Sequence, residues 1–243
     1  MFVMEVAGLR VRVFPQFSFV ETYCKDYEVQ NRSGEVDLII HLSLEEAKER
    51  RERSLGLGRR EYPLWYYESE ALFRKLAMKL PSFNALFLHS ALLSVNGAGI
   101  ALAAPSGGGK TVQLKLWQKA FPGEVHVLNG DKPIYRMQEE GALGYGSPWR
   151  GKEAIGEGGA VPLHAMFFLE KGKEPELRKL TSKEVMEEIL YYTELPIAGE
   201  EQAVARVLSV FLQRVPIYKL TCTMGEETVE LAWEEVCKLR GLG

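Results

Sequence analysis

The sequence of 243 residues predicts a mixed α/β protein in which a β-hairpin runs directly into a glycine-rich loop. Two apolar runs, residues 85–95 and 100–104, are joined by the turn residues Asn96 and Gly97, and such a pair is typical of a β-hairpin. The second run leads without interruption into the loop of residues 104–111, and a helical pattern follows. Because the strand before the loop has an antiparallel neighbour, we expect a sheet of mixed strand direction and not a purely parallel βαβ sheet.

Residues 1–82 are predicted to form a small N-terminal region that is rich in strands. Apolar and polar residues alternate there with a period close to two, which is the pattern of half-buried strands. Ser43 stands three residues before Glu46, the spacing of a capping box, and predicts the start of a solvated helix. Apolar residues at spacings of three and four predict an amphipathic helix that ends at Pro81. The expected elements are strands at residues 6–14, 23–29 and 36–40, and helices at 43–53 and 69–80.

Residues 83–243 are predicted to form a second, larger domain around the hairpin and the loop. Short apolar runs alternate there with helical patterns, whereas residues 141–159 are rich in glycine and predict an irregular region. After the loop we expect helices at residues 111–120, 182–193, 200–213 and 226–239, strands at 125–128, 134–137, 162–169 and 217–222, and a turn at 170–173.

The bulk composition limits the classes of function. A hydrophobic fraction of 46% with 26% charged residues is ordinary for a protein with a packed core. The formal net charge of −3 argues against a nucleic-acid partner, which would normally require a basic excess. Cys24, Cys222 and Cys237 have no CxxC spacing, so they predict reduced thiols. With no signal-peptide pattern and no apolar run of membrane-spanning length, we expect a cytoplasmic protein without a membrane partner, and a homo-oligomer stays open.

The loop has the residue types that binding of a polyphosphate requires. Gly107, Gly108 and Gly109 let backbone N–H groups come close to phosphate oxygens, and the N-terminus of the following helix favours an anion. Lys110 adds a full positive charge, and the hydroxyl of Thr111 is a ligand for magnesium. The pattern therefore predicts a site for a nucleoside triphosphate, ATP with Mg²⁺, that consists of Pro105, Ser106, Gly107, Gly108, Gly109, Lys110 and Thr111.

One position of the loop departs from the usual pattern, and one alternative interpretation of the loop stays open. The usual pattern opens with glycine where this chain has Ala104, and alanine costs little there if its φ is negative. A glycine-rich turn beside a chance Lys-Thr pair is the alternative to a phosphate site. The position of the loop between a strand and a helix favours the phosphate site.

The order of these motifs resembles the kinase core shared by bacterial HPr kinase/phosphorylase and phosphoenolpyruvate carboxykinase. In that core an upstream histidine, a phosphate-binding loop and an acidic segment follow one another. Here His89-Ser90-Ala91, the loop and residues 128–132 stand in the same order. The resemblance covers about residues 86–170, and residues 146–149, 160–163 and 167–170 resemble smaller relatives of this superfamily. It implies the fold of the HPr kinase C-terminal domain, with the phosphate loop fed by a hairpin.

The resemblance also implies roles for individual residues. Lys110 would contact the β- and γ-phosphates, and Thr111 would bind magnesium. Asp131 would bind magnesium or act as the base on an acceptor hydroxyl, and His89 would lie near the metal. The superfamily usually has two adjacent acids where this chain has Asp131 alone. An ordinary turn residue is the alternative for Asp131, and a core histidine is the alternative for His89.

A second loop, residues 149–153, carries two cations between glycine-rich stretches. Arg150 and Lys152 have the charge that stabilises phosphate oxygens during transfer, so the loop is interpreted as a second wall of the site, bounded by glycines that would let it close; a solvated surface loop is the alternative. Aromatic residues of the N-terminal region would either bind the acceptor or belong to the core. These are Tyr23, Tyr27, Tyr62, Trp65, Tyr66 and Tyr67.

Three functional hypotheses follow. The first is an ATP- and Mg²⁺-dependent kinase that transfers the γ-phosphoryl group to a hydroxyl of a protein, peptide or small-molecule acceptor. The second hypothesis, motivated by the missing second acid, is a nucleotide-binding regulatory module with little or no phosphoryl transfer. Carboxykinase chemistry on oxaloacetate is disfavoured, because the chain is far shorter than those enzymes.

Overall fold

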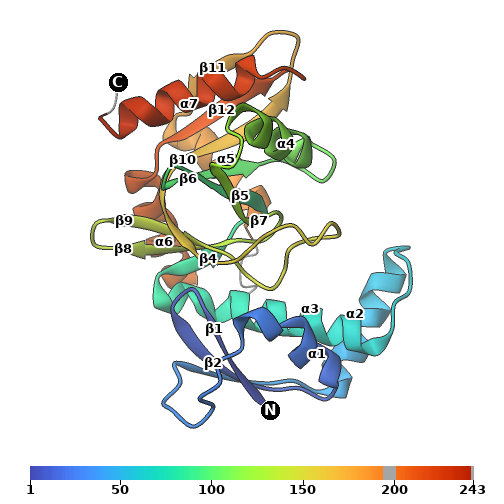
Figure 1. Cartoon of the computed structure of the whole chain (residues 1–243). Coiled ribbons are helices and arrows are strands. Elements are labelled where there is room, and N and C mark those ends of the chain that lie inside the picture. Colours follow the sequence, from blue (N-terminus) through green and yellow to red (C-terminus); the bar gives the residue numbers. More distant parts are fainter. Residues whose placement is uncertain (194–200, 242–243) are drawn as a thin grey trace. The chain divides into compact units, whose positions relative to one another are not determined.

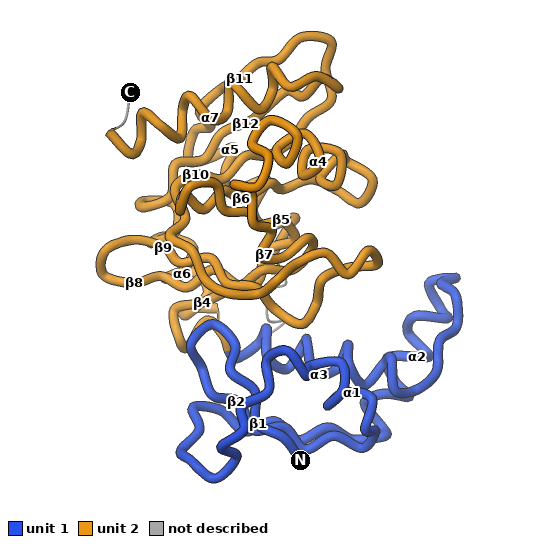
Figure 2. The backbone as a smooth tube through the Cα atoms, viewed as in Figure 1, with its two compact units in different colours: residues 1–79 blue, residues 80–243 orange. Residues whose placement is uncertain are grey.

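The computed structural model describes residues 1–193 and 201–241 (Figure 1). The chain divides into two compact units, Met1–Lys79 and Leu80–Gly243, which Figure 2 distinguishes by colour. The sequence placed this boundary after residue 82. Within the described ranges, no helix combines the length and the apolar character that crossing a membrane would require.

Unit 1 contains a three-stranded sheet and helices. Strand β2 pairs antiparallel with β1 and parallel with β3. Every second residue of β2 is fully buried, starting at Leu9, so the alternation in the sequence corresponds to one face of the sheet. The elements are β1 (Phe2–Val6), β2 (Leu9–Phe14), α1 (Ser18–Tyr23), a 3-10 helix (Lys25–Tyr27), β3 (Leu38–His41), α2 (Leu44–Gly56) and α3 (Leu64–Lys79).

The strand predicted over residues 23–29 is wrong, because the chain forms α1 and the 3-10 helix there. The carboxylate of Glu68, which is fully buried, accepts hydrogen bonds from the backbone N–H groups of Gln16 and Phe17 at 2.6 and 3.1 Å. These bonds fix the two residues just before α1, whose N-cap residue Phe17 makes no capping hydrogen bond through its side chain. A partner from α3, far along the chain, therefore stabilises a helix that the local pattern did not predict.

The helices predicted at residues 43–53 and 69–80 are present with shifted ends. The capping box of α2 is confirmed: Ser43 Oγ accepts from the N–H of Glu46 at 3.2 Å, and Glu46 Oε2 accepts from the N–H of Ser43 at 2.9 Å. Helix α3 starts at Leu64, earlier than expected. Of the aromatic residues in this unit, Tyr67 is fully buried while Tyr62 is 37% exposed, so they are not all core.

Unit 2 is built on a sheet of nine strands, and its strands run in mixed directions, as the sequence predicted. The strand order is β4-β8-β9-β10-β6-β5-β7, and β12 also pairs with β10 and with β11. Strand β10 runs parallel to β6 and to β12, and the other pairs are antiparallel. The strands are β4 (Ala85–Phe87), β5 (Ser90–Val95), β6 (Ala98–Ala103), β7 (Val125–Asn129), β8 (Ile134–Gln138), β9 (Gly141–Tyr145), β10 (Ala160–Lys171), β11 (Glu176–Lys179) and β12 (Ile217–Cys222).

The predicted hairpin consists of β5 and β6. Asn96 and Gly97 both have positive φ, 49° and 76°, which is the geometry of a type I′ turn. Strand β6 is buried along its whole length, because its side chains enter two hydrophobic clusters in alternation. Helices α5 and α6 contribute to one cluster and α4 and α7 to the other. The helices are α4 (Lys110–Ala120), α5 (Ser182–Tyr192), α6 (Glu201–Arg214) and α7 (Glu227–Leu239).

Several predictions for unit 2 differ from the structure. The apolar run of residues 85–95, predicted as one side of the hairpin, is divided into β4, which pairs with β8, and β5, which pairs with β6. Residues 141–145 form strand β9 inside the region predicted to be irregular, and the missing side chain of Gly144 leaves room for Leu92, whose Cδ2 atom lies 2.7 Å from where a Cβ atom would be. Residues 176–179 form strand β11, which local patterning did not predict. Strand β10 continues to Lys171, into the turn predicted at residues 170–173. Glu200, where the predicted third helix begins, lies outside the described residues.

Candidate functional site

The glycine-rich loop connects β6 to α4, as the sequence predicted. Gly107 and Gly109 have φ values of 75° and 104°, in the region that side-chain-bearing residues rarely adopt. Gly108 is required for another reason: a Cβ atom there would lie 2.8 Å from the Cβ of Ala104 and 2.9 Å from the carbonyl oxygen of Pro105. The three consecutive glycines are thus each demanded by the path of the backbone.

Ala104 occupies the position where the usual pattern has glycine. Its φ is not positive, and the residue is fully buried, so the structure accommodates alanine without backbone strain. Its carbonyl oxygen accepts a hydrogen bond from Nζ of Lys110 at 2.7 Å. This bond closes the loop on itself.

Helix α4 begins at Lys110, with Gly109 as its N-cap. The N–H groups of the first turn, which includes Thr111, have no partner inside the helix, and the helix dipole places partial positive charge on them. The loop residues Pro105, Ser106 and Gly107 are exposed. The loop therefore presents backbone donors at a surface that an anion can reach.

Lys110, His89 and Asp131 come together beside the loop. Nε2 of His89 lies 3.2 Å from Nζ of Lys110 and 3.0 Å from Oδ1 of Asp131. The side chains of His89 and Asp131 are 31% and 26% exposed, whereas Lys110 is buried. His89 precedes β5, Lys110 starts α4, and Asp131 follows β7, so three separate segments build this cluster.

Burial and charge act on the two ionisable ends of this cluster in different ways. Burial lowers the pKa of Lys110, and the charge of Asp131 opposes that effect. Burial alone would raise the pKa of Asp131. The hydrogen bond from His89, with the charges of His89, Lys132 and Lys110, outweighs burial and holds that pKa below its ordinary value. Asp131 is therefore a carboxylate at neutral pH.

The turn that carries Asp131 is held by two buried polar side chains, Asn129 and Ser147. Both are fully buried, and Asn129 Nδ2 donates to the carbonyl oxygen of Ser147 at 3.0 Å. Sequence analysis missed both residues. The Asn-Gly-Asp order was a signal for the first, because asparagine often accepts hydrogen bonds from the backbone two residues later. Nothing local identified the second.

The loop of residues 149–153 lies against Asp131. A Cβ atom on Gly151 would lie 2.9 Å from the Cβ of Asp131 and 3.1 Å from its Cγ, so the backbone of Gly151 packs closely against the side chain of Asp131. Trp149 is buried and its ring meets Phe87 edge to face at a centroid distance of 5.7 Å. Arg150 is half-buried and Lys152 is exposed. The structure thus brings the loop backbone to the cluster, and leaves Lys152 in solvent.

His89 is fixed from its other side by the end of helix α5. The N–H of His89 donates to the carbonyl oxygen of Tyr192 at 2.8 Å, and Leu88 forms an antiparallel bridge with Thr193. Tyr192 is buried against Phe168 of β10, with ring centroids 5.3 Å apart. The C-terminus of α5 therefore sets the backbone position of the histidine.

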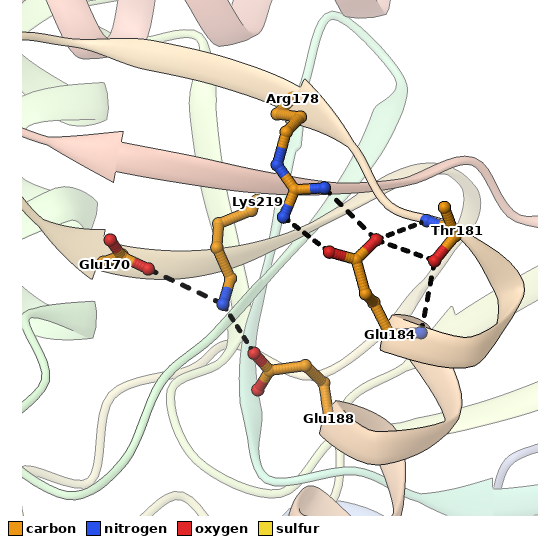
Figure 3. Close-up of polar contacts among 6 residues, drawn as sticks. All are labelled: Glu170, Arg178, Thr181, Glu184, Glu188 and Lys219. Carbon is orange, nitrogen blue, oxygen red and sulfur yellow. Dashed lines mark hydrogen bonds and ion pairs between the residues drawn. The ribbon is translucent and has the colours of Figure 1, made fainter.

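Ion pairs attach α5 to the neighbouring strands (Figure 3). Arg178 of β11 binds Glu184 in the first turn of the helix at 2.8 Å, and Glu184 also closes a capping box with Thr181. Lys219 of β12 binds Glu188 at 2.7 Å. The helix is thus anchored at its first turn and at its middle.

Residues 1–193 and 201–241 contain no group of three His, Cys, Asp or Glu side chains that converge to hold a metal ion. Magnesium in phosphate-transfer sites is commonly held by one or two carboxylates together with substrate phosphates. The carboxylate of Asp131 and the hydroxyl of Thr111 have the oxygen chemistry that such an arrangement requires.

No protein-family model matches the sequence, and a search of curated proteins finds no match. A search of solved structures finds similarity to the HPr(Ser) kinase/phosphatase from Coxiella burnetii. The alignment has 13% sequence identity and a TM-score of 0.38, and it covers 64% of this chain and 93% of that chain.

Proposed function

We propose that this chain binds a nucleoside triphosphate, ATP with Mg²⁺, on the loop of residues 104–111 and transfers its γ-phosphoryl group to a hydroxyl. The observation that carries the proposal is the cluster of Lys110, His89 and Asp131 beside a strand–loop–helix motif. The ammonium group of Lys110, which would bind phosphate, and the ionised carboxylate of Asp131 both contact the same histidine, His89. Phosphoryl transfer needs such a pair, because its catalysis consists mostly of positioning and charge stabilisation.

The loop and Lys110 would bind the triphosphate. Backbone N–H groups at the start of α4 would offer partial positive charge to the phosphates, and the Lys110 ammonium would add a full charge, whose attraction to phosphate is stronger where water is excluded. Nε2 of His89 carries either a proton or a lone pair, so it either donates to Asp131 or accepts from Lys110. When a phosphate oxygen accepts a hydrogen bond from Lys110, His89 is free to donate its Nε2 proton to the carboxylate of Asp131.

Asp131 would act on the acceptor. Its carboxylate takes the proton of the acceptor hydroxyl while that oxygen bonds to the γ-phosphorus, and the bond from phosphorus to the β–γ bridging oxygen breaks to release ADP. His89 orients the carboxylate through the 3.0 Å contact. Magnesium, when bound by Asp131, Thr111 and the phosphates, supplies charge neutralisation of the phosphate oxygens. Arg150 would add charge from the adjacent loop, whereas Lys152 would reach the phosphates only by movement of its exposed side chain.

A second candidate function is a regulatory module that binds nucleotide and transfers phosphoryl slowly or not at all. The observation that favours it is the single acid: Asp131 is followed by Lys132 and preceded by Gly130, so one carboxylate would have to serve metal and acceptor. In the leading proposal the acceptor is a hydroxyl of a protein, a peptide or a small molecule, and these three classes of acceptor stay open.

The two candidates are separated by measuring both binding and turnover. Calorimetry with Mg²⁺-ATP gives the dissociation constant, and release of ADP in the presence of a panel of hydroxyl compounds and seryl peptides gives turnover. The leading proposal predicts acceptor-dependent ADP release that Asp131→Asn abolishes. Tight binding of Mg²⁺-ATP without turnover for any acceptor would contradict the kinase and support the regulatory module. If Lys110→Met kept both Mg²⁺-ATP binding and ADP release, the result would contradict both candidate functions.

A further inference from the structure

We propose that Asn129 and Ser147 are positioning residues, which together lock the turn that carries Asp131 and join it to the Arg150 loop as one rigid unit. The inference deepens the proposed function, and rests on it only where turnover is the readout. The observation behind it is a hydrogen-bond network in which every donor and acceptor of two fully buried side chains is used.

The amide of Asn129 has its full set of partners. Oδ1 accepts from the backbone N–H of Asp131 at 2.9 Å and from that of Lys132 at 2.8 Å. Nδ2 donates to the carbonyl oxygen of Ser147 at 3.0 Å and to its hydroxyl at 3.2 Å. A side-chain amide offers two donors and two acceptor lone pairs, so no capacity remains. Rotation of the amide by 180° would place Nδ2, a donor, against the N–H groups of Asp131 and Lys132, which are also donors. Only one orientation of the amide therefore satisfies the network.

Ser147 links this turn to the next loop. Its hydroxyl donates to the carbonyl oxygen of Lys132 at 2.6 Å, and accepts from Asn129 and from the backbone N–H of Trp149 at 3.3 Å. Lys132 ends the turn of Asp131, and Trp149 begins the loop of Arg150. One hydroxyl therefore ties the two segments together, and buried polar groups that are completely satisfied make such a junction rigid.

Two consequences follow for the site. First, the saturated amide of Asn129 cannot bind magnesium, although it stands two residues before the acid, where a metal ligand would be a natural interpretation of the sequence. Second, the Arg150 loop is a fixed wall and not a closing lid. The N–H of Gly130 also donates to the carbonyl oxygen of Ile155 at 2.9 Å, and Gly151 packs on Asp131, so the turn contacts the middle of the loop and the segment just after it.

The test uses the whole chain with Asn129→Ala and Ser147→Ala, so that a failure of one variant to fold leaves the other. Backbone amide exchange measured by NMR reports on the N–H groups of Asp131 and Lys132 and needs no activity. We expect about a tenfold or greater acceleration of exchange at these two amides in Asn129→Ala, because both lose their acceptor. Asn129→Asp keeps the acceptor oxygens and should retain more of the protection.

Steady-state kinetics with Mg²⁺-ATP give the second readout. Asn129→Ala should lower kcat about tenfold or more and change the KM for ATP by less than about threefold, because Asp131 is displaced while the phosphate loop is intact. The matched control is Asn31→Ala. Asn31 makes a similar turn in unit 1, where its Oδ1 accepts from the N–H of Ser33 at 3.2 Å, and kcat should be unchanged.

Unchanged amide exchange in Asn129→Ala would overturn the proposal, and so would faster exchange with an unaltered kcat. A parallel loss of kcat and ATP affinity would also overturn it, since the network would then support the whole unit and not Asp131. If the wild type turns over no acceptor while exchange accelerates, the proposed function fails and the positioning of the turn stands.

Discussion

Replacement of Lys110 by methionine separates the affinity of the loop for triphosphate from the stability of the fold. Methionine keeps most of the buried aliphatic stem and removes only the ammonium group. That group donates to the carbonyl oxygen of Ala104 at 2.7 Å and lies 3.2 Å from Nε2 of His89. In the proposed function this ammonium group binds the phosphates of the nucleotide.

The expected magnitudes follow from these contacts. A hydrogen bond between a charged donor and its partner contributes about 1.5–3 kcal/mol. Since about 1.4 kcal/mol corresponds to a factor of ten, the dissociation constant for Mg²⁺-ATP should rise about 10- to 150-fold. The free energy of unfolding should change by less than about 2 kcal/mol, because two effects oppose each other: the variant no longer buries an ammonium, and the carbonyl of Ala104 loses its donor.

Isothermal titration calorimetry measures the affinity and urea denaturation measures the stability. The matched control is Lys115→Met, on the exposed face of the same helix, which should leave both quantities within about twofold of the wild type. A rise in the dissociation constant of less than about threefold in Lys110→Met would refute the assignment of this lysine to phosphate. A large loss of stability with unchanged affinity would indicate a purely structural lysine.

Three further substitutions test the surroundings of the loop. Asp131→Asn should lower turnover about 100-fold or more with less than about a threefold change in the calorimetric dissociation constant of Mg²⁺-ATP; equal losses would restrict Asp131 to metal binding. Gly151→Ala should cost about 1–2 kcal/mol of unfolding free energy in urea titration and also lower turnover, because φ is 74° and the new Cβ would lie 2.9 Å from the Cβ of Asp131; wild-type stability would count against this packing. The hydrogen bond from Arg178, with bonds from Thr181, lowers the pKa of Glu184 to about 2 from an ordinary 4.5. A pKa that is lower in the folded state stabilises the fold at pH values above the ordinary pKa, and this stabilisation is lost as the pH falls toward the pKa of the folded state. The urea midpoint of the wild type should therefore exceed that of Glu184→Gln at about pH 6 and approach it at about pH 3. A difference in midpoint that does not depend on pH would show that the carboxylate of Glu184 is not the cause of the difference.

The parts of the site that the sequence predicted are those with local causes. The hairpin follows from the turn residues Asn96 and Gly97, and the loop from three glycines before Lys110, because a few adjacent residues determine each backbone path. The same holds for the capping box at Ser43. Each of these features is complete within a short stretch of sequence.

The parts that the sequence missed depend on partners far along the chain. The chain just before helix α1 is held by Glu68, which is 51 residues from Phe17. Asn129 and Ser147, which hold the turn of Asp131, are 18 residues apart and belong to different segments. Strand β11 has a charged sequence, and it becomes a strand through its pairing with β12. Local periodicity contains no information about such contacts.

The proximity of His89 to Lys110 and Asp131 was expected only from the resemblance to a known kinase core. The residues themselves gave an apolar run with one histidine, for which a core position was an equal alternative. In the structure the side chain is 31% exposed and contacts both partners, so it is not a core histidine. The hydrogen bond from its backbone N–H to Tyr192 shows how α5 contributes to that placement.

A crystal structure of the chain with Mg²⁺ and a non-hydrolysable ATP analogue tests the proposed site most directly. We expect the triphosphate on the loop of residues 104–111, with Nζ of Lys110 bonded to its terminal phosphate and the carboxylate of Asp131 facing that phosphate or its magnesium. An analogue bound elsewhere on the chain, or one on this loop whose terminal phosphate points away from both Lys110 and Asp131, would contradict the proposed site.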